Sequence, residues 1–134
     1  MNDGFDFTAR FSVRVGDINY GGHMGNDRFL LLFHDARMLY LESLGFSEAD
    51  IGGVGLIMNE AHVDFKAEVF LRDSLEVGVR AADLGSIRFR LEYRVRRESD
   101  GVVVATGHTG MVAFDYRIRR PVKIPDKFRA AIAP

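Results

Sequence analysis

The sequence of 134 residues contains no cysteine. The chain can therefore form no disulfide, offers no thiolate nucleophile and lacks the ligands of cysteine-based zinc sites. It also lacks the run of about 18 apolar residues that a membrane-spanning helix needs. Its acidic first residues do not contain the apolar core of a signal peptide. We therefore expect a cytoplasmic protein.

The sequence has no excess of basic residues either. The formal net charge is −1, and acidic and basic residues are interspersed along the chain. A nucleic-acid-binding surface would be basic, so this balance argues against a nucleic-acid partner. The length suits one domain with a core of its own, and we expect residues 1–134 to form it.

Alternating apolar and polar residues predict a sheet. The predicted strands cover residues 5–15, 54–69, 75–81, 87–96 and about 102–115, and short helical segments are expected over 47–50 and 127–132. Asp100-Gly101 is a strong hairpin signal. Because the connections between the last four strands are short, we expect these strands to be antiparallel.

Residues 28–44 predict a helix that is apolar over most of its circumference. Its polar residues Arg28, Asp35 and Glu42 recur at seven-residue spacing and form one narrow stripe. Such a helix must be surrounded by other protein, and Gly45 should end it. We therefore predict an α+β hot-dog fold, in which an antiparallel sheet wraps around one long helix. Exposed sheet edges are expected to pair with a second copy in a homodimer, or in a dimer of dimers.

A polar, glycine-rich loop leads into this helix. It runs from Gly16 to Asn26 and carries an acid, an amide and an imidazole within one short segment. Asn26 or Asp27 is expected to cap the helix, whose first backbone N–H groups have no intrahelical acceptor. Such a helix end can hold an anion, or an oxygen that becomes negatively charged during a reaction. The loop is therefore the candidate functional site.

The same residues carry a family resemblance. They are Gly16-Asp17, Asn19, Gly22-His23 and Asn26 in the loop, Ala36-Arg37 and Tyr40 in the helix, and Phe65-Lys66, Gly85-Ser86 and Arg120-Pro121 further on. Over nearly its whole length the chain resembles the hot-dog thioesterases of the 4-hydroxybenzoyl-CoA thioesterase and YbgC type, whose loop reads roughly G-D-x-D-x-x-G-H-x-N-N. The resemblance implies hydrolysis of acyl-CoA thioesters, without metal or covalent cofactor, at subunit-interface sites beside the start of the helix.

The sequence departs from this family at one position. The family's catalytic carboxylate falls on Asn19, and an amide has no lone pair basic enough to act as a base. Asn19 can still orient a water, which leaves Asp17, His23 and Asp35 as candidates to activate it. Asp17 and Asn19 could instead form Asx-turns that shape the loop. Asp35 could be a solvated or ion-paired member of the polar stripe.

The resemblance also places the substrate. The thioester carbonyl is expected against a backbone N–H near Gly25 or Asn26, at the start of the helix. The pantetheine arm would pass the turn at Gly85-Ser86. The CoA phosphates would lie near Lys66 and Arg88, or Arg90. Arginines that alternate along a strand, however, usually mark only the solvated face of that strand. Acyl-CoA and an acyl carrier protein are both possible substrates.

Other charged residues of the chain have structural interpretations. A buried Arg37 would need a carboxylate partner, which Glu60 or Asp64 could supply. His34 lies off the polar stripe and is expected to be packed. The remaining histidines, His62 and His108, lie on predicted strands with no partners visible in the sequence.

Two alternative functions remain open. An (R)-specific enoyl-CoA hydratase has the signature G-D-x-N-P-x-H, of which Gly16 to Asn19 match the first half, but Tyr20 replaces the proline and His23 comes one residue late. The missing acid at position 19 would also suit a non-catalytic protein that binds acyl thioesters. Release of free thiol separates hydrolysis from both alternatives.

Overall fold

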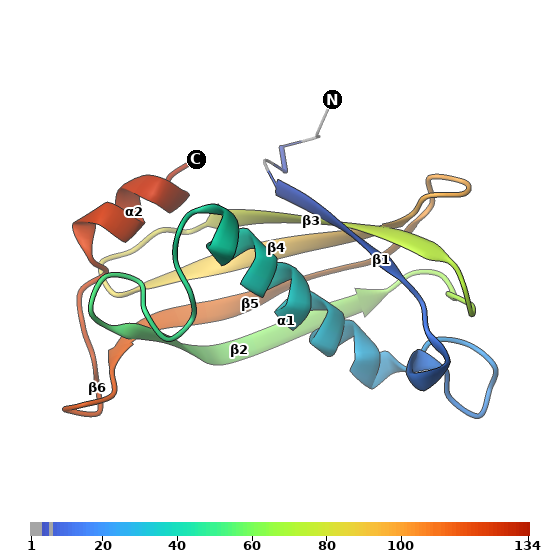
Figure 1. Ribbon diagram of the computed structural model, residues 1–134, viewed down its shortest axis with the longest axis horizontal. Coiled ribbons are helices and arrows are strands. Elements are labelled where there is room, and N and C mark those ends of the chain that lie inside the picture. The colour runs from blue at the N-terminus through green and yellow to red at the C-terminus, as the bar shows by residue number, and fades with distance from the viewer. Residues whose placement is uncertain (1–3, 6) are drawn as a thin grey trace.

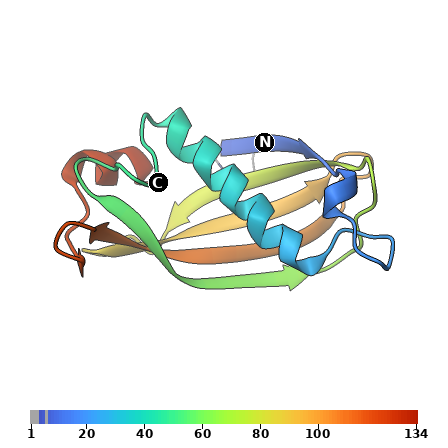
Figure 2. The same ribbon diagram turned by 60° about the horizontal axis from the view of Figure 1, so that its bottom comes forward.

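The computed structural model describes residues 4, 5 and 7–134. The elements are β1 (Phe7–Ser12), the short 3-10 helix η1 (Val15–Asp17), α1 (Asn26–Ser43), β2 (Gly55–Phe65), β3 (Ser74–Ala82), β4 (Arg88–Arg97), β5 (Val103–Asp115), β6 (Arg120–Pro121) and α2 (Asp126–Ile132). The strands pair antiparallel in the order β1-β3-β4-β5-β2, with β6 added to β5. As predicted, α1 lies across one face of this sheet, which curves around it (Figures 1 and 2). In this described part of the chain, none of the helices combines the length and apolar character needed to cross a membrane.

The core lies between α1 and the sheet. Phe33 of α1 is fully buried and stacks on Tyr93 of β4, with ring centroids 4.3 Å apart and planes 4° apart. Gly107 of β5 permits this approach, because a Cβ there would lie 2.7 Å from Phe33 Cε2. Burying one such aromatic side chain is worth about 1.5–3 kcal/mol, so this contact contributes to fixing the helix on the sheet.

The chain surrounds only one face of α1. Ala36 and Leu41 are fully buried against the rest of the core. Four apolar residues on its flanks remain 38–52% exposed, namely Leu30, Leu31, Met38 and Leu39. The sequence predicts a helix enclosed by protein, whereas the structure leaves these flanks exposed in the single chain.

Strand and helix ends differ from the sequence prediction in places. The first strand ends at Ser12, and Val15 is 76% exposed because it lies in η1. The second strand ends at Phe65, where Lys66 and Ala67 both donate to the Val104 carbonyl and leave the ladder. Residues 47–50, predicted as a helical turn, instead form a bend in which the Ser47 and Asp50 backbones bond to each other.

Several local predictions are confirmed. Gly45 follows α1 with a φ of +86°, and Gly101 turns the β4–β5 hairpin with a φ of +73°. Both conformations suit glycine because it lacks Cβ. The helix start differs from the prediction, because Gly25 is the N-cap instead of Asn26 or Asp27.

Candidate functional site

The loop before α1 is folded back on itself. Ile18 and Met24 form an isolated antiparallel bridge, and the Asn19 N–H donates to the His23 carbonyl at 2.9 Å. The Met24 N–H donates to the Val69 carbonyl at 2.7 Å, which ties the loop to the segment after β2. The loop therefore holds its side chains on an ordered backbone at one end of the sheet (Figure 1).

Asn19 has the structural role that was one of its two interpretations. Its Oδ1 accepts from the Gly21 N–H at 2.9 Å, which closes an Asx-turn. Its Cβ lies 3.8 Å from the position that a Cβ on Gly25 would occupy. Asn19 therefore shapes the loop and lies beside the start of α1.

His23 lies next to Asn19 in the loop and has two polar neighbours. Its Nδ1 is 3.2 Å from the Met24 carbonyl oxygen, and its Nε2 is 3.7 Å from Glu68 Oε2. In the tautomer that donates Nδ1–H to Met24, Nε2 carries the lone pair that can accept a proton. The Glu68 carboxylate would stabilise the imidazolium that results. Glu68 could not be identified from the sequence, because it lies far downstream of His23 and the contact between Met24 and Val69 brings it near.

The start of α1 is open to a ligand. No described side chain forms a capping hydrogen bond there. The Gly25 N–H, one of the two predicted donors to the substrate, already donates to the Asp17 carbonyl at 2.9 Å. The first N–H groups of an α-helix have no intrahelical acceptor, so those of Asn26 and Asp27 are the donors that remain.

The side chains of the two carboxylates among the predicted catalytic residues face a groove beside the loop. Asp17 and Asp35 both line an open groove of about 470 Å³ between β1 and α1, together with Arg10, Arg14 and Arg28. One oxygen of Asp17 accepts from the Arg14 N–H at 2.9 Å. Asn19 and His23 are not among the described residues that line this groove. The structure therefore divides the five predicted catalytic residues between two places.

The predicted substrate-binding residues are also divided. Lys66 follows β2 at the same end of the sheet as the loop. Gly85, Ser86 and Arg88 lie at the opposite end, where the β3–β4 connection passes beside α2 (Figure 1). Arg129 of α2 donates to the Gly85 carbonyl. Within one chain, these three residues therefore lie at the end of the sheet away from the loop.

Arg37 has a different partner from the two predicted, Glu60 and Asp64. It donates through Nε to Glu48 Oε1 at 3.1 Å and through Nη1 to the Tyr93 hydroxyl at 3.1 Å. The prediction was wrong because the loop after α1, and not β2, covers this part of the helix. Burial lowers the pKa of the guanidinium, but Tyr93 and Glu48 outweigh that effect and the pKa is raised overall.

The other three histidines also have partners. His34 is 46% exposed and its Nε2 lies 3.2 Å from Glu48 Oε1, so the prediction that it is packed was wrong. His62 and His108 stack across β2 and β5 with ring centroids 5.4 Å apart. Across residues 4, 5 and 7–134, no three His, Cys, Asp or Glu side chains gather as a metal site would require.

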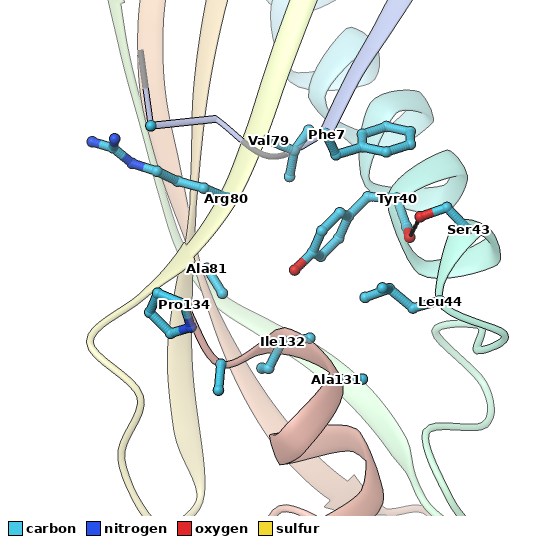
Figure 3. Close-up of a pocket in the computed structure, with 12 residues that line it drawn as sticks. Phe7, Tyr40, Ser43, Leu44, Val79, Arg80, Ala81, Ala131, Ile132 and Pro134 are labelled. Atoms are coloured by element: carbon cyan, nitrogen blue, oxygen red, sulfur yellow. Dashed lines mark hydrogen bonds between the residues drawn. The ribbon is translucent and has the colours of Figure 1, made fainter. Parts of the chain in front are cut away.

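A second, smaller cavity lies at the far end of α1. It has a volume of about 160 Å³ and is bounded by α1, β1, β3 and α2. Figure 3 shows the Tyr40 hydroxyl pointing into it, among short apolar side chains such as Ala81 and Ile132. Its described lining contains no Asp, Glu or His, so no carboxylate or imidazole side chain in it can act as a base.

Comparisons with known proteins agree with this architecture. A family model described as "Thioesterase-like superfamily" matches residues 13–132. The chain is 26% identical to a 1,4-dihydroxy-2-naphthoyl-CoA hydrolase of Synechococcus elongatus, over 92% of this chain and 93% of that protein. It superimposes on a 1,4-dihydroxy-2-naphthoyl-CoA thioesterase from Synechocystis with a TM-score of 0.87 and 25% identity, covering 94% of each chain. A hypothetical protein from Staphylococcus aureus, solved in complex with CoA, gives a TM-score of 0.87 and 26% identity over 95% of this chain and 81% of that one.

These findings confirm the predicted hot-dog fold. The names of the two functionally described relatives are those of a hydrolase and a thioesterase. They do not favour a hydratase or a non-catalytic binding protein.

Proposed function

The chain belongs to the thioesterase-like superfamily, and we propose that it hydrolyses acyl-CoA thioesters to a free acid and CoA. The observation that carries this proposal is the joint position of His23, Glu68 and the uncapped start of α1. An imidazole with a carboxylate neighbour can accept a proton, and the free N–H groups at a helix start can stabilise a negative oxygen. Thioester hydrolysis needs both a base for the attacking water and donors for the oxygen that becomes negative.

The start of α1 serves as the oxyanion site in this proposal. The thioester carbonyl oxygen accepts from the N–H groups of Asn26 and Asp27, which point out of the uncapped helix end. As water attacks, this oxygen becomes negatively charged, and the helix dipole favours that charge. Removing one such donor typically raises the barrier by about 3 kcal/mol.

His23 is the base. Its Nε2 takes a proton from a water molecule as the water oxygen bonds to the carbonyl carbon. The C–S bond then breaks with its electron pair on sulfur, which receives the proton from the imidazolium. Glu68 stabilises the imidazolium formed at Nε2. Asn19 holds the loop through its Asx-turn. Asp17 and Asp35 take no part in this step, because they line the separate groove between β1 and α1.

We further propose that the protein acts as a homodimer joined through β2. This strand is an outer edge of the sheet, and its residues Ile57, Met58 and Phe65 are 39–48% exposed. An unpaired edge is a template for pairing with another chain, and two-fold symmetry makes that pairing antiparallel. The Gly55 end of one β2 then lies beside the Phe65 end of the other.

Such pairing explains the separation of the substrate-binding residues. Ala113 of β5 pairs with Leu56 at the beginning of β2, and its N–H donates to the Ile87 carbonyl. The Gly85-Ser86 turn therefore lies at the sheet end that the partner subunit turns toward the loop. A CoA thioester could then contact residues of both copies. Assembly of two such dimers into a tetramer and a cytoplasmic location stay predictions from the sequence.

Release of free thiol from a panel of acyl-CoAs tests the proposed activity. We expect hydrolysis by the wild type and a loss of about 100-fold or more in kcat for His23→Gln. The matched control is His108→Gln, an imidazole on the outer face of the sheet that should not affect the reaction. Hydration of crotonyl-CoA without thiol release, or thermal stabilisation by acyl-CoA without any turnover, would overturn the proposal in favour of the hydratase or the binding protein.

A further inference from the structure

The connection between β2 and β3 contains Glu68, the carboxylate beside the proposed base, and its backbone is held at both ends. At its start the Lys66 N–H donates to the Val104 carbonyl at 2.9 Å. At its end the Val13 N–H donates to the Asp73 carbonyl at 2.9 Å. The position of Glu68 itself depends on further contacts made between these two ends.

A side chain from the β4–β5 hairpin supplies one of these contacts. Arg97, the last residue of β4, donates through Nη1 to the Glu68 carbonyl oxygen at 2.7 Å. The next carbonyl, that of Val69, accepts from the Met24 N–H, also at 2.7 Å. The hairpin, the connection and the loop before α1 lie at the same end of the sheet (Figure 1). Two consecutive carbonyl groups therefore join the connection to the hairpin on one side and to the loop that carries His23 on the other.

Asp100 fixes the direction in which the Arg97 guanidinium points. Its carboxylate accepts from Nε at 3.0 and 3.1 Å and from Nη2 at 2.8 Å, so it engages one edge of the guanidinium with both oxygens. Asp100 Oδ1 also accepts from the Val102 N–H at 3.1 Å, which holds the carboxylate in the hairpin turn. The remaining nitrogen of the planar group, Nη1, is thereby presented to Glu68. The Arg97 side chain is 17% exposed, so solvent has little access to this arrangement.

The contact between Glu68 and His23 needs this support. The Glu68 side chain is 65% exposed and that of His23 is 32% exposed. An exposed ion pair contributes little by itself, because two side chains must lose conformational freedom to form it. A fixed backbone at Glu68 restricts the positions that its carboxylate can reach. Less freedom is then lost when the carboxylate faces the imidazole.

We infer that the Arg97–Asp100 pair positions the proposed site, because it holds the Glu68 backbone where the carboxylate faces the base. This inference rests on the proposed thioesterase activity and gives the β4–β5 hairpin a part in it. In the described part of the chain, no hydrogen bond or ion pair joins either member of the pair to His23 or to α1. Both are therefore positioning residues, and their effect on the reaction passes through Glu68.

A double-mutant cycle tests whether the effect passes through Glu68. Arg97→Gln should lower kcat with acyl-CoA by about 5-fold, less than the loss of about 10-fold expected for Glu68→Gln, and should leave KM unchanged. When Glu68→Gln is already present, adding Arg97→Gln should lower kcat by no more than about 1.5-fold, since the group that it holds is gone. Two independent effects would multiply to about 50-fold in the double variant, which would overturn the inference.

Two further variants separate position from charge. Arg97→Lys keeps the positive charge but cannot bond Asp100 and the Glu68 carbonyl through one rigid fork. It should therefore lower kcat as Arg97→Gln does, and a wild-type kcat in this variant would overturn the positioning role. Arg96→Gln is the matched control. Arg96 is the neighbouring arginine of β4 and bonds to Glu76 of β3 at 3.3 Å, away from the β2–β3 connection, so kcat should not change.

Amide hydrogen exchange gives a measurement that does not depend on activity. If Arg97 holds the connection, Arg97→Gln should speed exchange of the Met24 N–H, which donates to the Val69 carbonyl, by about 10-fold. The Ala113 N–H, which donates to the Ile87 carbonyl at the other end of the sheet, should exchange as in the wild type and guards against general unfolding. Unchanged exchange at Met24 would overturn the inference. A wild type that releases no thiol from acyl-CoA would instead overturn the proposed function itself.

Discussion

His23 Nε2 lies 3.7 Å from Glu68 Oε2, which joins the loop before α1 to the segment after β2. If this carboxylate stabilises the imidazolium formed during hydrolysis, Glu68→Gln should lower kcat by about 10-fold, which is less than loss of the base itself. Steady-state kinetics with acyl-CoA, followed by release of free thiol, measure the change. An unchanged kcat would show that Glu68 is only a surface neighbour.

Gly25 leaves the start of α1 uncapped, and this should favour activity over stability. In Gly25→Ser the new hydroxyl can accept from the first-turn N–H groups that the proposal gives to the substrate oxygen. The position tolerates a side chain, because the nearest atom to a Cβ, 2.7 Å away, is the end of the Asp27 carboxylate. We expect kcat to fall by about 10-fold or more while the melting temperature is unchanged or slightly raised. Gly25→Ala, which adds Cβ without a hydroxyl, is the control and should retain most of the activity.

Gly107 allows α1 to approach the sheet, so Gly107→Ala should destabilise the fold. A Cβ there would meet the Phe33 ring on one side and the His62 carbonyl oxygen close by. We expect a loss of about 1–3 kcal/mol in the free energy of unfolding, the usual cost of overpacking a core. Gly16→Ala is the matched control, because no atom lies within 4 Å of its Cβ position. Urea denaturation of the three proteins measures the difference, and equal stabilities would contradict the packing described.

Ala61 lies near the middle of β2, the strand through which we propose that two copies pair. Ala61→Asp would add a carboxylate to each of two paired strands that already carry Glu60 and Asp64, so we expect the dimer to dissociate. Thr8→Asp makes the same change on β1, at the other edge of the sheet, and should leave the mass in solution unchanged. Analytical ultracentrifugation distinguishes the outcomes. A dimeric Ala61→Asp protein would contradict pairing through β2.

Asp50 should make the 47–53 turn sensitive to acid. The N–H groups of Gly53 and Gly52 lower the pKa of this carboxyl below its ordinary value. A carboxyl with a lowered folded-state pKa adds stability above the unfolded-state value of about 3.9, and this stability is lost as the pH falls through the folded-state pKa. Asp50→Asn should therefore be less stable than the wild type at pH 7 and equally stable near about pH 2. Denaturation curves at both pH values test this.

The long helix and the sheet could be predicted because their signals are local. The apolar pattern over residues 28–44, the glycine at position 45 and the Asp100-Gly101 turn each determine the structure around them. The alternation of apolar and polar residues predicted the main strands equally well. The predicted ends of the first two strands were wrong, because β1 ends before Val15 and β2 ends at Phe65. There, hydrogen bonds from other parts of the fold end the strand although the apolar alternation continues.

The side-chain partners could not be predicted in this way. Glu68 beside His23 and Glu48 beside His34 come from segments far apart in the sequence, and no motif spacing joins them. Arg37 is a similar case. Its need for a carboxylate partner was predicted, but whether that partner comes from the loop after α1 or from β2 depends on which segment covers the helix. The family pattern indicated the loop as the candidate site, and this stays a prediction. It could not indicate that the Gly25 N–H is already bonded to Asp17.

α1 is a single unbroken helix from Asn26 to Ser43. In the proposed reaction its first turn holds the oxyanion, while Phe33 in the middle of the helix stacks on Tyr93 of the sheet. Because one helix carries both features, a substitution that loosens this stack should lower turnover as well as stability, although it lies away from the loop.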